Sequence, residues 1–247
     1  MKHVVAASLA FGAAALTGFG QIAPAAVYAA EQTETVKTES TKSGEQADEG
    51  LFKEETVYVN ADANGAVKLI TVSDWLKNAG TTESLKDVSE LDGIKNIKGE
   101  ETFSESGDNL TWDTNGADIY YQGTTEKELP VSVKLTYYLD GKKISSSELK
   151  GKSGHLKIKI DYTNNTKKSV NVSGKSEELS SPFVMMTGMI LPNETFSNVA
   201  IDNGKVVSDG NRNIVLGFAV PGMKESLGMN DFSQSSSQVS LPRSEER

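Results

Sequence analysis

The feature that most constrains the fold of this chain is a regular alternation of apolar and polar residues. In GHLKIKIDYTNNT, residues 154–166, every second side chain of the central run is apolar: Leu156, Ile158, Ile160 and Tyr162. The stretch at 131–139 alternates in the same way. A period of two places apolar side chains on one face of a β-strand and polar ones on the other. The pattern predicts strands with one buried and one solvent-facing side.

Turn signals separate these strand-like runs. Five Asn-Gly or Asp-Gly pairs lie between them, at 64–65, 115–116, 140–141, 203–204 and 209–210. Such pairs favour type I′ hairpin turns, because both central residues of that turn need positive φ. A short hairpin is expected around the pair at 203–204. The predicted fold class is all-β and antiparallel: an Ig-like β-sandwich preceded by a small mixed β module, with few short helices.

Helical signal is limited to three short segments. SDWLKNAG at 73–80 predicts one or two helical turns, and TESLKDVSEL at 82–91 predicts another short helix. In SSSELKG, Ser145 stands three residues before Glu148. That spacing is typical of a capping box and predicts a single turn between strands.

The first 29 residues are typical of a secretory signal peptide. Lys2 precedes an almost wholly apolar run from Val4 to Phe19, and the small residues Val27 and Ala29 follow at the positions that signal peptidase reads. Cleavage is expected after Ala29, and a retained membrane anchor is the alternative. The chain has no cysteine, so neither a lipoprotein anchor nor a disulfide is available. An exported protein without disulfides suits a Gram-positive bacterium, at the cell surface or outside the cell.

Composition divides the rest of the chain. Residues 30–53 are polar and acidic, and are predicted to form a disordered linker. Residues 54–123 are expected to form a small β-rich module and residues 124–222 an Ig-like sandwich of about seven strands. Residues 223–247 lose the alternation and are predicted to be an unstructured tail. An interrupted pattern of this kind favours the front part of a longer protein over a released one.

The charge balance argues against two classes of partner. Removal of the signal peptide takes away one lysine and no acid, which leaves 24 basic against 34 acidic residues and a net charge of −10. Nucleic acids and anionic lipids are bound through clusters of Lys and Arg, so neither is an expected partner. No later stretch has the roughly 18 apolar residues of a spanning helix. Membrane association would therefore come through a part beyond this sequence.

Catalytic and metal-binding side chains are scarce. His155 is the only histidine outside the signal peptide, and it falls on the polar face of its strand. Without cysteine or a second histidine, a His-based triad or a zinc site is not predicted. Carboxylates are plentiful, so a two-carboxylate hydrolase stays open, although no spacing singles out a pair. The sequence thus predicts no catalytic, cofactor or metal residue, and no enzyme activity.

A partial calcium-loop pattern occurs early in the chain. Asn60, Asp62 and Asn64 precede Gly65 with the spacing of the first half of such a loop. The twelfth position is Thr71 rather than glutamate, and the same residues suit a hairpin turn. The turn is the preferred interpretation, and calcium binding is left open.

Two apolar groups of residues have a binding interpretation. Trp112, Tyr120 and Tyr121 lie near an Asn-Gly turn and form a possible ligand face for a sugar. The alternative is that Trp112 and one tyrosine are core residues, which leaves Tyr120 as the freer ring. FVMMTGMILP, residues 183–192, is predicted to be a strand buried on both sides, with a methionine-lined groove as the alternative.

Two long stretches resemble a known group of proteins. ETVYVNADANGAVKLITVSDWL and IYYQGTTEKELPVSVKLTYYLDGKKISSSELKGKSGHLKIKIDYTNN are similar to the exported N-terminal region of large Firmicutes cell-envelope proteins. Some of these are grouped with YhgE/Pip (phage infection protein-like) membrane proteins. The resemblance covers residues 54–222. It implies a β ectodomain that a helical region and membrane spans would follow, and it supplies no catalytic residues.

These observations favour a non-enzymatic exported module of a cell-envelope protein, with a structural or interaction role. Its possible partners are a cell-wall polymer, a glycan or another envelope protein. A carbohydrate-binding module or adhesin is the first alternative, and a secreted carboxylate-based hydrolase is the second.

Overall fold

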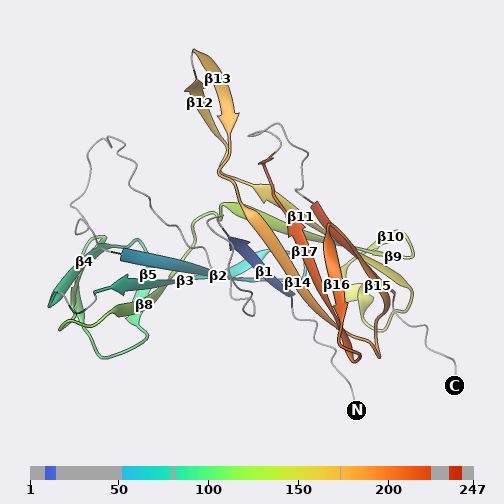
Figure 1. Ribbon diagram of the computed structural model, residues 1–247, viewed down its shortest axis with the longest axis horizontal. Helices are drawn as coiled ribbons and strands as arrows, with labels where there is room; N and C mark the ends of the chain where they lie inside the picture. The colour runs from blue at the N-terminus through green and yellow to red at the C-terminus, as the bar shows by residue number, and fades with distance from the viewer. Residues whose placement is uncertain are drawn as a thin grey trace. The chain divides into compact units, whose positions relative to one another are not determined.

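The chain is an all-β, antiparallel, sandwich-like protein, which confirms the predicted fold class (Figure 1). The computed structural model describes residues 9–14, 52–78, 80, 82–172, 174–223 and 234–240. It divides into two compact units: a first unit of residues 28–60 and 67–127, and a second unit of residues 1–27, 61–66 and 128–247. The division at 127 and 128 lies close to the predicted boundary at 123 and 124.

The first unit contains two antiparallel sheets. Four strands form one sheet in the order β2 (Phe52–Ala61), β3 (Val67–Lys77), β8 (Ile119–Thr125), β5 (Asp92–Asn96). Three strands form the other, in the order β4 (Ser84–Val88), β7 (Asn109–Asp113), β6 (Phe103–Ser106). Side chains from both sheets share one core of buried residues: Leu76, Leu85, Leu110, Trp112, Ile119 and Tyr121. Strand β2 begins at Phe52, so the predicted linker at 30–53 ran two residues into the first strand.

Two of the predicted helices are strands. SDWLKNAG contributes to β3 and TESLKDVSEL contains β4, so both helical predictions were wrong. In β3 the buried positions are every second residue, Val72, Asp74 and Leu76. Helical propensity is a weak preference, and pairing with neighbouring strands overrides it here. The polar Asp74 at a buried position hid the strand alternation.

The second unit contains two larger sheets. One has the order β1 (Leu9–Ala14), β14 (Val184–Pro192), β17 (Arg212–Ala219), β16 (Gly204–Ser208). The other has the order β10 (Lys142–Ile144), β9 (Val131–Leu139), β11 (His155–Asn164), β18 (Gln234–Ser240), β15 (Ser197–Asp202). Two buried clusters fill its core: Val131, Leu135, Ile160, Tyr162, Met185 and Ala219 in one, and Met189, Leu191 and Val215 in the other.

A two-stranded hairpin extends from the second unit. Strands β12 (Lys168–Val172) and β13 (Lys175–Leu179) pair with each other and with no further described strand. Figure 1 shows the hairpin projecting away from the two sheets of its unit. Every residue of both strands is exposed.

The single predicted turn in SSSELKG is confirmed. Ser146–Leu149 form a short 3-10 helix, η1, with a capping box. The backbone N–H of Ser145 donates to Glu148 Oε2 at 3.1 Å, and the Ser145 hydroxyl donates to the same oxygen at 2.6 Å. These bonds satisfy groups that a helix start leaves unpaired.

The two ends of the chain contribute strands that the sequence did not predict. Residues 223–247 were predicted to be unstructured, but Gln234–Ser240 form β18 between β11 and β15. A ladder of backbone hydrogen bonds does not need apolar side chains, so a serine-rich segment can complete a sheet. Leu9–Ala14, inside the predicted signal peptide, pair with β14. The rest of residues 1–29 and most of the predicted linker lie outside the described residues.

Strand β14 is buried on one side only. Met185, Thr187 and Met189 face the core, whereas Met186 and Ile190 are exposed. The prediction of a strand buried on both sides was therefore wrong. An exposed apolar side chain is common at protein surfaces, so apolar content alone did not determine burial.

Two of the five predicted turns, Asn115-Gly116 and Asp140-Gly141, have the positive φ at both central residues that a type I′ turn requires. At 203–204 only Asn203 has a positive φ, of 56°, so the type I′ prediction was wrong there. The flanking strands β15 and β16 lie in different sheets, so the hairpin predicted at 203–204 is a crossing between sheets. A turn signal favours a local backbone conformation and leaves the choice of partner strand to the packing of the core.

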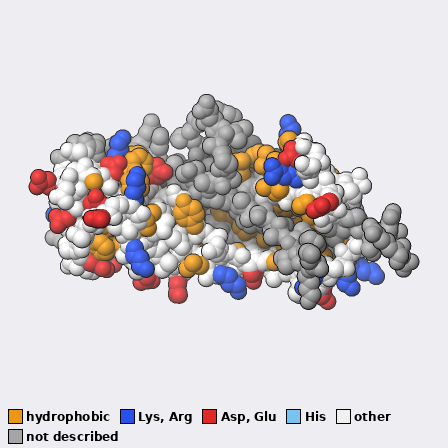
Figure 2. All heavy atoms as spheres, turned by 90° about the horizontal axis from the view of Figure 1, so that it is seen from below, with side chains coloured by type: hydrophobic (Ala, Val, Ile, Leu, Met, Phe, Trp, Pro, Cys, Tyr) orange, Lys and Arg blue, Asp and Glu red, His pale blue; other side chains and the backbone are white. Residues whose placement is uncertain are grey.

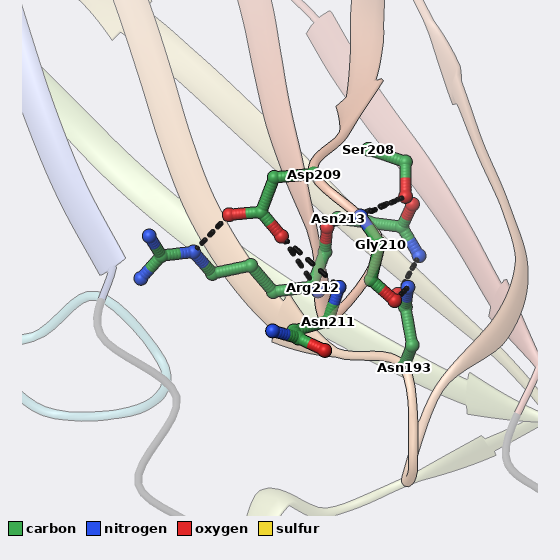
Figure 3. A network of polar contacts seen from close by, with 7 residues as sticks. All are labelled: Asn193, Ser208, Asp209, Gly210, Asn211, Arg212 and Asn213. Atoms are coloured by element: carbon green, nitrogen blue, oxygen red, sulfur yellow. Dashed lines mark hydrogen bonds and ion pairs between the residues drawn. The ribbon is translucent and has the colours of Figure 1, made fainter.

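The turn at 209–210 does close a hairpin, between β16 and β17 (Figure 3). Asp209 Oδ1 accepts from the backbone N–H groups of Asn211 and Arg212, and its Oδ2 accepts from Arg212 Nε at 2.7 Å. Asn193, which directly follows β14, donates to the carbonyl of Gly210 at 3.0 Å. These contacts join two neighbouring turns at one end of the unit.

Candidate functional site

The three aromatic residues of the predicted ligand face do not lie on one face. Trp112 and Tyr121 are fully buried and stack on each other in the core of the first unit, with ring centroids 5.4 Å apart. Only Tyr120 points to the outer side of its sheet. Neighbouring residues of a strand point to opposite sides, so Tyr120 and Tyr121 are separated by the sheet itself. The shared face of Trp112, Tyr120 and Tyr121 is therefore corrected to Tyr120 alone.

Tyr120 belongs to a different aromatic row on that outer side. Its ring stacks on Trp75, the residue opposite it on β3, with centroids 5.8 Å apart and planes 3° apart. Phe52 meets Trp75 edge-on at 5.5 Å, and Lys98 Nζ lies 4.2 Å from the centroid of Tyr120. We call Phe52, Trp75, Tyr120 and Lys98 the outer aromatic row. Trp75 was missed because its segment was predicted to be helical.

Two other sequence predictions fall on ordinary structural positions. His155 is exposed on β11, as its place in the alternation predicted. Asp62 Oδ1 accepts from the backbone N–H groups of Asn64 and Ala66, at 2.8 and 3.1 Å. The Asp62 carboxylate thus serves the turn between β2 and β3, the preferred interpretation of the calcium-like pattern around Asn60. Among the described residues, no group of three or more His, Cys, Asp or Glu side chains is arranged to hold a metal ion.

The most unusual chemistry lies inside the first unit. Asp74 and Tyr121 are opposite each other on β3 and β8, and both point between the two sheets. Asp87 points toward them from β4, which belongs to the facing sheet. Lys53 reaches the same place from β2. We call these four residues the buried lysine cluster.

The contacts within the buried lysine cluster are close. Lys53 Nζ lies 2.9 Å from Asp87 Oδ2 and 3.4 Å from Asp74 Oδ2. The Tyr121 hydroxyl donates to Asp87 Oδ2 at 2.5 Å and accepts from Lys53 Nζ at 3.1 Å. Asp74 is 2% exposed and Asp87 4%, whereas the Lys53 side chain is 27% exposed. Both carboxylates are therefore largely removed from water, which makes their pairing with lysine important.

Asp74 has the weaker set of partners. Neither of its carboxylate oxygens accepts a hydrogen bond by ordinary geometry, although Oδ2 is in ion-pair range of Lys53. Burial raises the pKa of Asp74 above its usual range, and the nearby lysine only partly opposes that change. A buried carboxyl with few partners favours its neutral form. Asp74 is thus suited to hold and release a proton.

Lys53 and Tyr121 keep their protons. Burial opposes the charge of Lys53, but the carboxylates of Asp74 and Asp87 outweigh it and raise the pKa of the lysine. Burial and the same carboxylates raise the pKa of Tyr121, so its hydroxyl stays a hydrogen-bond donor. The cluster therefore contains an amine donor, a paired carboxylate, a proton-holding carboxyl and a hydroxyl.

Sequence reasoning missed the buried lysine cluster for identifiable reasons. Lys53 fell at the end of the predicted linker, and Asp74 and Asp87 fell in predicted helices. The neighbours of a charged strand residue in the sequence do not reveal its partner. Lys53 and Asp87, for example, are 34 residues apart. Only the close packing of two sheets brings these residues together.

Comparison with known proteins gives no relative for this chain. A scan against protein-family models, a search of curated proteins and a search of solved structures each returned no significant match. No helix among the described residues has the length and apolar character needed to span a bilayer. Figure 2 shows acidic and basic side chains spread over the face in view, with hydrophobic side chains in small groups among them.

Proposed function

We propose that this chain is a non-enzymatic, exported cell-envelope module with a structural or interaction role, and that it is the front part of a larger membrane protein. The apolar N-terminal run and the resemblance to Firmicutes envelope ectodomains motivate export. One structural observation favours the structural role. The buried acids of the first unit contact a lysine of the same unit, rather than facing a space that a substrate would enter.

The hydrolase alternative has less support. Glycoside hydrolysis needs two carboxyl groups on either side of a bound sugar. Asp74 and Asp87 are the two carboxylates buried together, and at 2% and 4% exposure they are out of reach of a polysaccharide. Lys53 also occupies the position beside both of them.

The carbohydrate-binding alternative is favoured by a specific feature, the outer aromatic row. Aromatic rings at a sheet surface supply apolar area that sugars can contact, and Lys98 adds a positive charge next to it. The row also has a feature against it. Trp75 and Tyr120 stack on each other, and Phe52 and Lys98 contact them, so part of each of these two rings is already covered.

Two assays on the purified full chain test these proposals. We expect no turnover of cell-wall polymers, peptides or glycosides, and measurable hydrolysis of any of them would contradict the non-enzymatic role. A glycan array tests the alternative, with Tyr120→Ala as the variant and Tyr58→Ala as the matched control, since Tyr58 is an exposed tyrosine of the same unit. Glycan binding that Tyr120→Ala removes and Tyr58→Ala retains would establish the outer aromatic row as a binding site.

A further inference from the structure

We propose that Lys53 and Asp87 form an intramolecular amide bond that covalently joins the two sheets of the first unit. The two reacting groups are already in contact, with Nζ 2.9 Å from Oδ2. Lys53 belongs to β2 in one sheet and Asp87 to β4 in the facing sheet. The bond would therefore be a cross-link between layers, of the kind that a chain without cysteine cannot make through a disulfide.

The surroundings supply what amide formation needs. Amines and carboxylates do not condense in water, because both groups are charged and hydrated. The excess of water also favours hydrolysis of the amide over its formation. Holding the two groups in contact replaces a bimolecular encounter with a unimolecular step. The near-complete burial of Asp87 and Asp74 removes most of the competing water. The cluster is arranged as the reactants of this condensation would be.

The step balances in atoms and charge. Nζ of Lys53 forms a bond to Cγ of Asp87, one Cγ–O bond of that carboxyl breaks, and the oxygen leaves as water. The ammonium nitrogen gives up two protons, and both leave on the departing oxygen. One positive and one negative charge become a neutral amide and one water molecule. No oxidant, reductant or further reactant is required.

Asp74 and Tyr121 have separate roles in this step. The resting lysine is an ammonium ion, so a proton must leave Nζ before it can attack. Asp74, neutral at rest and with Oδ2 3.4 Å from Nζ, can give its own proton to the carboxyl of Asp87 and take one from Nζ in exchange, ending unchanged. The Tyr121 hydroxyl, which donates to Asp87 Oδ2 at 2.5 Å, stabilises the negative charge on that oxygen while Cγ is tetrahedral.

Peptide mapping of the full chain tests the bond. The purified protein is denatured, digested with trypsin and analysed by mass spectrometry. We expect residues 43–68, uncut after Lys53, to be joined to residues 87–95 or to the longer 78–95, at the summed mass less one water. Full recovery of the linear peptides 43–53 and 54–68, with no branched species, would overturn the proposal. The wild-type digest decides this whether or not any variant folds.

Two variants assign the chemistry. Lys53→Arg keeps the positive charge and removes the attacking amine, and should abolish the branched peptide. Asp74→Asn keeps the shape and removes the proton-holding carboxyl, and should lower the branched fraction at least about tenfold after equal times, since proton transfer by a placed side chain is worth that much or more. A folded Asp74→Asn protein, checked by circular dichroism, that is cross-linked as fully as the wild type would refute the role of Asp74.

The second unit supplies a matched control. Lys159 Nζ lies 2.9 Å from Asp161 Oδ1, the same distance as in the proposed bond, and the two lysines are similarly exposed, but the Asp161 side chain is 27% exposed whereas that of Asp87 is 4% exposed. This pair should stay linear in the same digest. Cross-linking of Lys159 to Asp161 at a similar level would show that contact alone is sufficient, and would remove the argument from burial. Amide formation does not depend on export, so its failure would leave the proposed function in place.

Discussion

At the residue scale, a single amide holds one end of the first unit together. Asn78, which is 2% exposed, donates through Nδ2 to the carbonyls of Thr82 and Ala117 and to the Thr114 hydroxyl. Its Oδ1 accepts from the backbone N–H and the hydroxyl of Thr82. An asparagine side chain offers two donor hydrogens and one carbonyl oxygen, and every one of them is used here.

Replacing Asn78 should therefore be costly. In Asn78→Ala the carbonyl of Ala117 and the backbone N–H of Thr82 lose this partner, and each buried polar group left unsatisfied costs about 1–3 kcal/mol. Asn109→Ala is the control, because Asn109 is exposed and donates only a long 3.4 Å bond to the carbonyl of Ser106. Urea unfolding measures both variants. Equal midpoints for Asn78→Ala and the wild type would show that the network contributes little.

At the element scale, the alternation of residues was enough to predict the central strands of the second unit, but not every strand of either unit. The runs at 131–139 and 155–164 are strands β9 and β11, because their inward positions are filled by apolar side chains. The last part of strand β3 was predicted to be helical because the polar Asp74 occupies an inward position there. Strand β18 was missed because serines fill it, and only its neighbours explain its pairing.

The dependence on neighbouring strands also explains which residues of the candidate sites could be predicted from the sequence. Tyr120 could be selected from the sequence because it is an aromatic residue near a turn signal. The contact of Tyr120 with Trp75 and the buried lysine cluster both depend on which strands are adjacent. The local sequence pattern does not show which strands are adjacent. Lys53 meets Asp87 only after two sheets have packed face to face.

Gly204, at the start of β16, gives a prediction for the second unit. A Cβ added at Gly204 would lie 2.2 Å from the carbonyl oxygen of Leu216 and 3.0 Å from Ile201 Cδ1. Gly204→Ala should therefore destabilise the unit by about 1–3 kcal/mol, as overpacking does. Gly188→Ala is the matched control, since a Cβ there meets nothing within 4 Å. A Gly204→Ala melting temperature equal to that of Gly188→Ala would contradict the tight packing.

At the scale of the whole molecule, the chain is a succession of two β-sandwich units, each with its own core. Two packed sheets around a filled apolar core form a stable platform, which suits a surface module. The proposed amide bond would add a covalent tie to the first unit. The central claim, however, concerns where the protein is and what it is part of.

The most direct measurement is the size and location of the native protein. An antibody raised against residues 54–222 would be used to blot cytoplasmic, membrane and culture-medium fractions of the source cells. We predict a band well above the 26.5 kDa of this chain, in the membrane fraction. A band of about the size of this chain in the cytoplasm would contradict export. A band of that size in the medium would contradict membership of a larger membrane protein.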